Sequence, residues 1–265
     1  MHKRFEKQLL SQPKEVVFCK KCVMSNQRPR ITFDEEGICG GCRNTEYFKN
    51  GIDWQTREKE LIDLLDKYRS SDGSYDVLVP SSGGKDSAYV AHELKFKYGM
   101  NPLTVTWSPL MYTDIGWKNF QSLRDAGLSN YLISPNGKLH RNLSRLCLEE
   151  LGDAFHIFVL GQVCLPFRIA LQTNIKLVMF GENGEAEYAG DPATLDKSMI
   201  PTEEFDRLYF KGSNIDELVE FAKNEKKYFD KGFCSSDIDL YKIPDINLLI
   251  KNGIVGKHFY SYYRK

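Results

Sequence analysis

The stretch VPSSGGKDSAYVAHEL, at residues 79–94, decides the fold of this 265-residue chain. It begins at the end of an apolar run, YDVLV at 75–79, which is typical of a buried parallel strand. Small residues follow, and a helical run over about 86–98 then places Val90 and Leu94 on one stripe. The stretch predicts a strand, a tight loop and a helix, without the GxxxxGK[ST] spacing of the common nucleotide-binding P-loop.

The same alternation continues along the chain. Strands are predicted at 101–107, 130–134 and 174–180, and helices at 115–126, 138–151 and 154–173. Strands that alternate with helices predict an α/β fold, a doubly wound parallel sheet with right-handed crossovers. Ligands bind such sheets beyond the carboxyl ends of the strands, where the loops after the first and fourth strands meet.

The loop after the first strand is suited to binding an anion. Residues 82–84 let the backbone turn its N–H groups toward one point, and the next helix adds its positive N-terminal end. Ser82 and Ser87 offer hydroxyls, and Lys85 offers a charge. The carboxylate of Asp86 would repel phosphate unless a cation lies between them, which indicates Mg²⁺. A glycine-rich turn without a ligand is the alternative interpretation.

Four of the seven cysteines cluster near the N-terminus as C-x2-C-x16-C-x2-C, at Cys19, Cys22, Cys39 and Cys42. This spacing predicts a structural zinc ribbon with four thiolate ligands and no open position for catalysis. A redox pair and an iron–sulfur cluster are the alternatives. We expect a short hairpin between the two cysteine pairs, with its turn at 34–37, and a tight turn at Gly40 and Gly41.

Residues 82–87 (SGGKDS) match the SGGxDS motif of the PP-loop ATP pyrophosphatases, and they lie between a predicted strand and a predicted helix. The resemblance implies a loop that grips the β- and γ-phosphates of ATP, which is then cleaved between the α- and β-phosphates. A substrate oxygen is adenylylated, and a nitrogen or sulfur nucleophile displaces AMP. It implies catalytic roles for Lys85, Asp86 and Ser87. The ATP-binding set in this loop is Ser81, Ser82, Gly83, Gly84, Lys85, Asp86 and Ser87.

The fourth strand leads into GENGEAEYAGD at 181–191. In relatives that use ammonia, this loop carries a glycine, an asparagine and an acidic residue that contact ATP and Mg²⁺. The matching residues here are Gly181, Asn183 and Glu187, with Glu182 and Glu185 as further candidates, and Asp86 and Glu187 as the expected magnesium ligands. Glutamates on a solvated loop are the alternative.

The cysteine ribbon, a tryptophan-containing helix, SSGGKDS and GENxxxEYxG together resemble the N-acetyl sugar amidotransferases, over about residues 15–195. These enzymes act in surface-polysaccharide (lipopolysaccharide) and flagellin-glycan biosynthesis, in pathways of pseudaminic acid and related sugars. The resemblance implies that ATP adenylylates the amide oxygen of an N-acetylated, nucleotide-linked sugar. Ammonia then replaces that oxygen to give an acetamidino sugar.

The source of ammonia is the next question. Cys147 and Cys164 lie in apolar helical surroundings and are predicted to be core residues, so the sequence shows no glutaminase. The resemblance implies a separate glutaminase partner or free ammonia. His140 and His156 are predicted to be structural or solvated.

The predicted organisation has four parts: a zinc-ribbon region at 1–52, a linker helix at 53–72 capped by Asp53, a PP-loop domain at 73–195, and a C-terminal helical or substrate region at 196–265. A helix is predicted at 214–229, capped by Asn214. Members of the resembling family continue past the aromatic tail, so we expect a shortened or variant form with an incomplete sugar pocket. The tail tyrosines, Tyr260, Tyr262 and Tyr263, fit a stacking role or a core role equally.

Composition narrows the function further. Lys+Arg and Asp+Glu both number 36, and this balance argues against a general nucleic-acid binder. No apolar stretch of membrane-spanning length and no signal-peptide core is present, so we expect a cytoplasmic protein. Two alternatives to the amidotransferase are a tRNA-modifying PP-loop enzyme of the thiolation or lysidine type, and a non-catalytic scaffold that binds nucleotide or a glutaminase.

Overall fold

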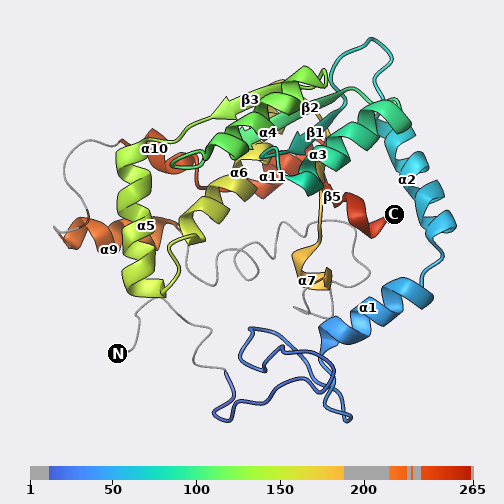
Figure 1. The fold of residues 1–265 in the computed structure, drawn as a ribbon. Helices are drawn as coiled ribbons and strands as arrows, with labels where there is room; N and C mark the ends of the chain where they lie inside the picture. The colour runs from blue at the N-terminus through green and yellow to red at the C-terminus, as the bar shows by residue number, and fades with distance from the viewer. Residues whose placement is uncertain (1–11, 188–214, 226–227, 229–233, 264–265) are drawn as a thin grey trace.

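The computed structural model describes residues 12–187, 215–225, 228 and 234–263. A five-stranded sheet in the order β3-β2-β1-β4-β5 lies at its centre, and every neighbouring pair of strands is parallel (Figure 1). The strands are β1 (Val77–Pro80), β2 (Pro102–Trp107), β3 (Ser129–Ile133), β4 (Leu177–Phe180) and β5 (Val255–His258). The predicted doubly wound α/β fold is confirmed.

The four predicted strands are present within a few residues of their predicted bounds. The sheet buries most of β1, β2 and β4, whereas the edge strand β3 is largely exposed. The fifth strand, β5, pairs with β4 and places His258 beside Phe180. The sequence predicted only short alternating elements in this part of the chain. Strand order reverses between β1 and β4, so the loops that follow these two strands open onto one crevice.

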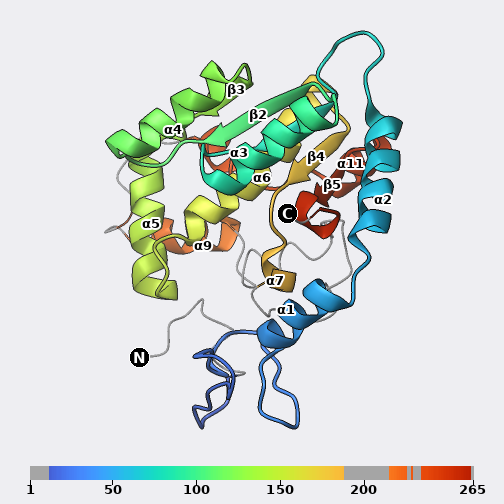
Figure 2. The ribbon, with the colours of Figure 1, turned by 45° about the vertical axis from the view of Figure 1, so that its right-hand side comes forward.

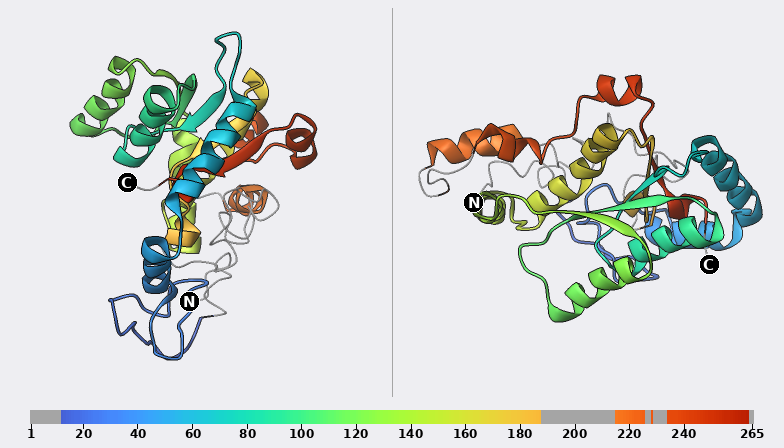
Figure 3. Two further views of the ribbon diagram at one scale, coloured as in Figure 1. Left: turned by 90° about the vertical axis from the view of Figure 1, so that its right-hand side faces the viewer. Right: turned by 90° about the horizontal axis from the view of Figure 1, so that it is seen from above.

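Helices cover both faces of the sheet (Figure 3). On one face, Leu78 of β1 packs with the buried residues of α5 (Gly137–Leu151) and α6 (His156–Thr173). On the other face, Val77 and Val79 pack with α2 (Trp54–Tyr68) and α3 (Lys85–His92). Alternate residues of one strand therefore serve two separate cores, as the period of two requires.

The remaining helices complete these two layers. They are α1 (Gly40–Asn50), the π-helical turn η2 (Glu93–Lys97) that continues α3, α4 (Asp114–Asp125), α7 (Gly184–Glu187), α9 (Ile215–Asn224), α10 (Ser235–Asp239), α11 (Ile246–Lys251) and the 3₁₀ turn η5 (Phe259–Ser261). The predicted cap Asn214 lies outside the described residues. Among those residues, none of the helices has both the length and the hydropathy that a membrane crossing needs.

Helix α2 begins where the sequence predicts. The Asp53 carboxylate accepts hydrogen bonds from the backbone N–H groups of Gln55 at 3.0 Å and Thr56 at 3.3 Å, which confirms the cap. Leu61 and Leu65 are fully buried in the core shared with β1 and β4. The helix expected as a linker therefore also forms part of the packing of the sheet.

Helix α1 was not predicted. Gly40 and Gly41 were expected in a tight turn, and instead they form the first turn of this helix, with Cys39 as its N-cap residue. The Cys42 N–H donates to the Cys39 carbonyl at 3.0 Å, so the second cysteine pair straddles a helix start. The sequence predicted a turn because glycine has a low helix propensity. The prediction was wrong because the helix begins within the cysteine cluster, where tertiary contacts outweigh that propensity.

Helices α1 and α2 follow one another down one side of the molecule, and the cysteine-bearing segment lies at the end remote from β3 (Figure 2). The predicted turn at 34–37 is confirmed by a hydrogen bond from the Gly37 N–H to the Asp34 carbonyl at 2.9 Å. An antiparallel bridge between Phe33 and Cys39 closes the short hairpin. We call residues 12–50 the cysteine unit.

Candidate functional site

The loop after β1 turns sharply at Gly83, whose φ is +84°. A Cβ on Gly83 would lie 2.9 Å from the backbone of Phe120 in α4, so glycine is required both for the conformation and for the close approach. Gly84 is the N-cap residue of α3, and its side-chain-free backbone leaves the start of the helix open. We call residues 82–87 the SGGKDS loop.

Hydroxyl groups hold the SGGKDS loop in shape. The Ser81 and Ser87 hydroxyls lie 3.2 Å apart, and the Ser87 hydroxyl also donates to the Gly84 carbonyl at 3.2 Å. The Ser81 N–H donates to Val105 of β2 at 2.8 Å, so Ser81 continues the sheet rather than facing solvent. The Ser82 hydroxyl accepts from the Gly84 N–H at 3.3 Å. These hydrogen bonds fix the shape of the loop.

The charged residues of the loop, Lys85 and Asp86, form an ion pair with each other. Lys85 Nζ lies 2.6 Å from one carboxylate oxygen of Asp86 and 2.8 Å from the other. The Lys85 side chain is 88% exposed, whereas the Asp86 side chain is 42% exposed. The Lys85 side chain therefore lies at the rim of the site, paired with Asp86.

A second loop follows β4, and we call residues 181–187 the GEN loop. The Glu187 N–H donates to the Asn183 carbonyl at 2.9 Å, and the Asn183 N–H donates to Glu187 Oε1 at 3.3 Å. The Glu187 carboxylate is thus turned back on its own helical turn, α7, and Asn183 is buried. The side chain of Glu185 lies outside the described residues.

A cavity of about 360 Å³ opens between the two loops. Its walls contain six of the predicted residues: Ser82, Gly84, Asp86, Ser87, Gly181 and Glu182. The structure brings these two sets together from the ends of β1 and β4, as the topology predicts. Ser81, Gly83, Lys85, Asn183 and Glu187 are in the loops but not in the cavity lining.

The rest of the cavity lining was not predicted. It consists of Pro80 and Phe180 at the strand ends, Val159, Gln162 and Val163 on α6, Gly184 at the start of α7, and His258 at the end of β5. Among these residues, only Phe180 had a sequence signal for a place in the cavity, because it ends an apolar strand. The α6 residues reach the cavity because Gly161 lets the helix lie against Trp107, where a Cβ would be 2.2 Å from the ring.

His258 has the most unusual environment in the cavity. Its side chain is almost fully buried, and its ring lies 6.2 Å from that of Phe180, between ring centres. Its Nδ1 is buried without a hydrogen-bond partner among the described residues. Burial lowers the pKa of His258 to about 4, so the ring is neutral near pH 7.

The tail tyrosines pack onto the two loops. The Tyr260 hydroxyl donates to the Asp86 carbonyl at 3.2 Å, and its N–H donates to the Gly181 carbonyl at 3.2 Å. Tyr262 is buried, and the Tyr263 hydroxyl lies 3.2 Å from that of Tyr89. The structure therefore places these side chains in the core beside α3, and Tyr260 connects the SGGKDS loop to the GEN loop.

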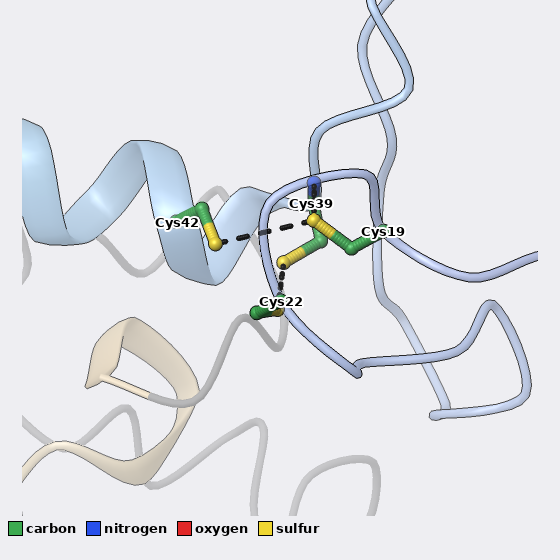
Figure 4. Close-up of side chains that lie close together, drawn as sticks. All are labelled: Cys19, Cys22, Cys39 and Cys42. Atoms are coloured by element: carbon green, nitrogen blue, oxygen red, sulfur yellow. Dashed lines mark hydrogen bonds between the residues drawn. The ribbon is translucent and has the colours of Figure 1, made fainter.

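The four early cysteines converge, as their spacing predicts (Figure 4). Their sulfur atoms all lie within 4.8 Å of one another, with Cys19 to Cys42 at 3.9 Å and Cys22 to Cys39 at 3.6 Å. Four sulfurs at about 2.3 Å from one tetrahedral Zn²⁺ would be about 3.8 Å apart. The cluster therefore fits a single zinc ion, which could be bound by all four cysteines.

The electrostatics of the cluster also fit a cation. Burial alone would raise the pKa of the Cys19 thiol, but N–H groups of Cys39 and Lys21 donate to its sulfur and lower that pKa to about 6. Burial and the neighbouring sulfurs raise the pKa of Cys42 to about 12. Four thiolates cannot all ionise this close together unless a positive ion compensates their charge.

Burial also tests the roles predicted for two further cysteines and two histidines. Cys147 and Cys164 are fully buried, and burial raises the pKa of the Cys164 thiol, so neither is a nucleophile exposed to substrate. His140 is buried with its Nδ1 2.9 Å from the Tyr241 hydroxyl, and His156 is buried. The predicted core role of both cysteines and the structural role of both histidines are confirmed.

The cysteine unit contacts the GEN loop directly. Helix α1, which begins inside the cysteine cluster, packs against α7 of the GEN loop (Figure 1). Gly184 at the start of α7 lines the cavity. The cysteine cluster is thus one short helix away from the wall of the site.

Comparisons with known proteins add little to this geometry. No family model matches the chain. An uncharacterized protein of Methanocaldococcus jannaschii is 30% identical over 88 residues, which are 33% of this chain and 31% of that protein. The chain thus matches about a third of the length of that relative. An NH3-dependent NAD synthetase from Campylobacter jejuni subsp. jejuni is similar over 76% of this chain and 95% of its own, with a TM-score of 0.38 and 18% identity. The function has to be inferred from the residues of the site.

Proposed function

We propose that this chain is an ATP-dependent amidotransferase of the PP-loop type that converts the N-acetyl group of a sugar into an acetamidino group. One observation carries the proposal. The SGGKDS loop and the GEN loop, separated by about a hundred residues in the chain, line one cavity at the carboxyl edge of a parallel sheet. Both loops are those that resemble the nucleotide-binding loops of PP-loop ATP pyrophosphatases.

The SGGKDS loop would hold the pyrophosphate part of ATP. The start of α3 presents backbone N–H groups and the positive end of the helix to an anion. Ser82 and Ser87 line the same wall and add hydroxyl donors. Lys85, at the rim, would swing from Asp86 to the leaving pyrophosphate and stabilise its charge.

Magnesium fits the carboxylates of this cavity. Asp86 and Glu182 both line it, and carboxylate oxygens are the protein ligands that Mg²⁺ prefers. A bound Mg²⁺ would neutralise phosphate charge beside these side chains. Glu187, the other expected ligand, bonds to the Asn183 N–H here, and a role at the metal would require it to leave that bond.

The reaction would proceed in two displacements. The amide oxygen of the acceptor attacks the α-phosphorus, the bond between the α- and β-phosphates breaks, and pyrophosphate leaves. Ammonia then attacks the imidate carbon, the carbon–oxygen bond breaks, AMP leaves with the former amide oxygen, and the nitrogen loses a proton. Ammonia is already a nucleophile, so the cavity needs no residue that activates it.

The ammonia would come from a separate glutaminase or from solution. The buried state of Cys147 and Cys164 supports this, because a glutaminase of the cysteine type needs an accessible thiol. The choice of an N-acetylated, nucleotide-linked sugar rests on the combined motifs described above. We place the reaction in the cytoplasm, in surface-glycan synthesis, with zinc in the cysteine unit serving only to hold the fold.

The test is an assay of the purified protein with ATP, Mg²⁺, ammonium chloride and a panel of N-acetylated nucleotide sugars. Equal amounts of AMP and pyrophosphate should form, and the sugar should lose one oxygen and gain one NH, a mass change that spectrometry resolves. ADP and phosphate instead of AMP and pyrophosphate would contradict the proposal.

The same assay separates the alternatives. Pyrophosphate release that depends on tRNA and on no sugar would identify an RNA-modifying enzyme. A protein that binds ATP but releases nothing with any acceptor, with or without glutaminase and glutamine, would be a nucleotide-binding scaffold. Asp125→Ala, an exposed carboxylate change outside the cavity lining, is the matched control for variants of Asp86.

A further inference from the structure

Two chemically different sets of residues line the cavity, and we call them its two halves. Polar and acidic groups of the two loops line one half, including Ser87, Asp86 and Glu182. The other half, formed by Val159 and Val163 of α6 and the end of β4, is apolar. Two residues interrupt that apolar half with neutral hydrogen-bonding groups, and these are Gln162 and His258.

We propose that this second half, which His258, Gln162 and Phe180 define, is the acceptor subsite and that it takes an uncharged amide group. The proposal rests on the proposed function, because an acceptor site presupposes adenylyl transfer. His258 is the positioning residue of the subsite, and it acts by hydrogen bonding to the acceptor rather than by chemistry on ATP.

The place of His258 in the sheet supports this division. β5 is separated from β1 by β4, and neighbouring strands are about 4.8 Å apart, so the end of β5 is roughly 10 Å from the start of the SGGKDS loop. A diphosphate bound at that loop would not reach His258. The α-phosphate and its acceptor, which meet between the two loops, would extend toward it.

The unpartnered nitrogen supports a ligand. His258 is 4% exposed, and its buried Nδ1 has no hydrogen-bond partner in the parts of the chain that the structure describes. Buried polar atoms in folded proteins nearly always have a partner, so a group missing from this atom's surroundings is expected. A neutral imidazole has one N–H donor and one acceptor nitrogen, and either of them can bond to one polar group of an amide.

The charged groups in the described lining of the cavity disfavour a carboxylate acceptor. The charged side chains in the described lining are Asp86 and Glu182, both acidic. The nearby Lys85 is at the rim and pairs with Asp86. A carboxylate placed against Phe180 and His258 would be desolvated without a cation, whereas an amide with a methyl group would be matched by the apolar wall.

The experiment compares His258→Leu, which removes both ring nitrogens at similar size, with His258→Gln, which retains a donor and an acceptor. Thermal unfolding first establishes that each variant is folded. Affinity for α,β-methylene-ATP with Mg²⁺ is then measured by calorimetry. The half-saturating concentration of the best N-acetylated nucleotide sugar is measured by pyrophosphate release.

His258→Leu should raise the half-saturating sugar concentration at least tenfold and change the affinity for the ATP analogue less than twofold, and His258→Gln should recover most of the loss. The side-chain ¹⁵N signals of His258, assigned by their absence in His258→Gln, should move when the sugar is added and not when the nucleotide is added alone. Parallel loss of nucleotide affinity would overturn the proposal, because His258 would then face adenosine.

An unchanged sugar dependence in a folded His258→Leu protein would also overturn the subsite while leaving the proposed function in place. Silence of the unmodified protein with every acceptor is a different result. It would overturn the proposed function itself, and the acceptor subsite with it.

Discussion

The cysteine unit and the central cavity are built in opposite ways. All four sulfurs of the cysteine unit come from residues 19–42, and their spacing alone predicts that they converge. The cavity draws its walls from the ends of β1, β4 and β5 and from α6, which are far apart in the chain. Local spacing thus defines the cysteine cluster, whereas the order of the strands defines the cavity.

The two regions nevertheless touch, through α1 and α7. The two regions therefore arise from different parts of the sequence pattern, but they are in contact in the folded chain. Four changes test where the separation ends, and they are described from the largest expected effect to the smallest.

Removal of the metal should have the largest effect. Cys22→Ser, or a strong chelator, should release about one zinc per chain and unfold the cysteine unit, because zinc contributes about 10–16 kcal/mol of binding free energy to folding in such small units. Metal analysis and limited proteolysis measure this. Because α1 packs against α7, the affinity for an ATP analogue should also fall.

Cys234→Ser is the control for the metal experiment, since Cys234 is exposed and outside the cluster. Finding no metal in purified, reduced protein would contradict the zinc assignment. Full nucleotide affinity in an unfolded cysteine unit would show that the two regions are independent despite their contact.

Asp86→Ala should reduce pyrophosphate release by about 100- to 1000-fold, the usual cost of losing one group that stabilises the transition state. Its carboxylate lines the cavity beside the SGGKDS loop, and the zinc content should stay unchanged. Turnover and metal analysis of the same samples test both statements. Turnover close to that of Asp125→Ala would count strongly against the nucleotide assignment.

Gly83→Ala should lower the free energy of unfolding more than Gly73→Ala. Both glycines have positive φ, at +84° and +81°, so each alanine meets a cost of about 1–2 kcal/mol from the left-handed conformation. At Gly83 the new Cβ would also lie 2.9 Å from the backbone of Phe120, whereas nothing lies within 4 Å at Gly73.

Urea unfolding of the two glycine variants measures the difference between them. Equal losses of stability would show that the loop does not need its close contact with α4. A larger loss at Gly83 would show that the cavity depends on contacts from the neighbouring helix.

Tyr260→Phe should have the smallest effect. It removes the hydrogen bond to the Asp86 carbonyl, a loss of about 0.5–1.5 kcal/mol, and should weaken binding of the ATP analogue about two- to tenfold. Tyr263→Phe, which removes the contact with Tyr89 instead, is the control. Equal affinities in both variants would show that the tail does not position the SGGKDS loop.

The sequence predicted the parts of the molecule whose signal is local. Four strands were found because each is a short apolar run, and the cysteine cluster because ligand spacing is a chemical requirement. The SGGKDS loop was found because its residues are unusual in both type and order. The cap at Asp53 was found because an aspartate directly before a helical pattern is a typical N-cap residue.

What the sequence did not predict depends on packing. Helix α1 starts with two glycines and is held by the cysteine cluster, which propensity does not describe. His258 ends a four-residue strand, VGKH, whose polar alternation gives no sign of a cavity. The Glu187 carboxylate faces Asn183 rather than the cavity because a single helical turn brings the two together. Such placements follow from which strands become neighbours.

The position of β5 in the chain has a consequence for synthesis. The ribosome makes β1 and β4, with both cavity loops, well before β5, and the strand that brings His258 and leads to Tyr260 is added at the far side of β4. A nascent chain that ends before β5 can fold most of the sheet but lacks the last wall of the cavity. Translation therefore completes the two cavity loops first and the wall that contains His258 last.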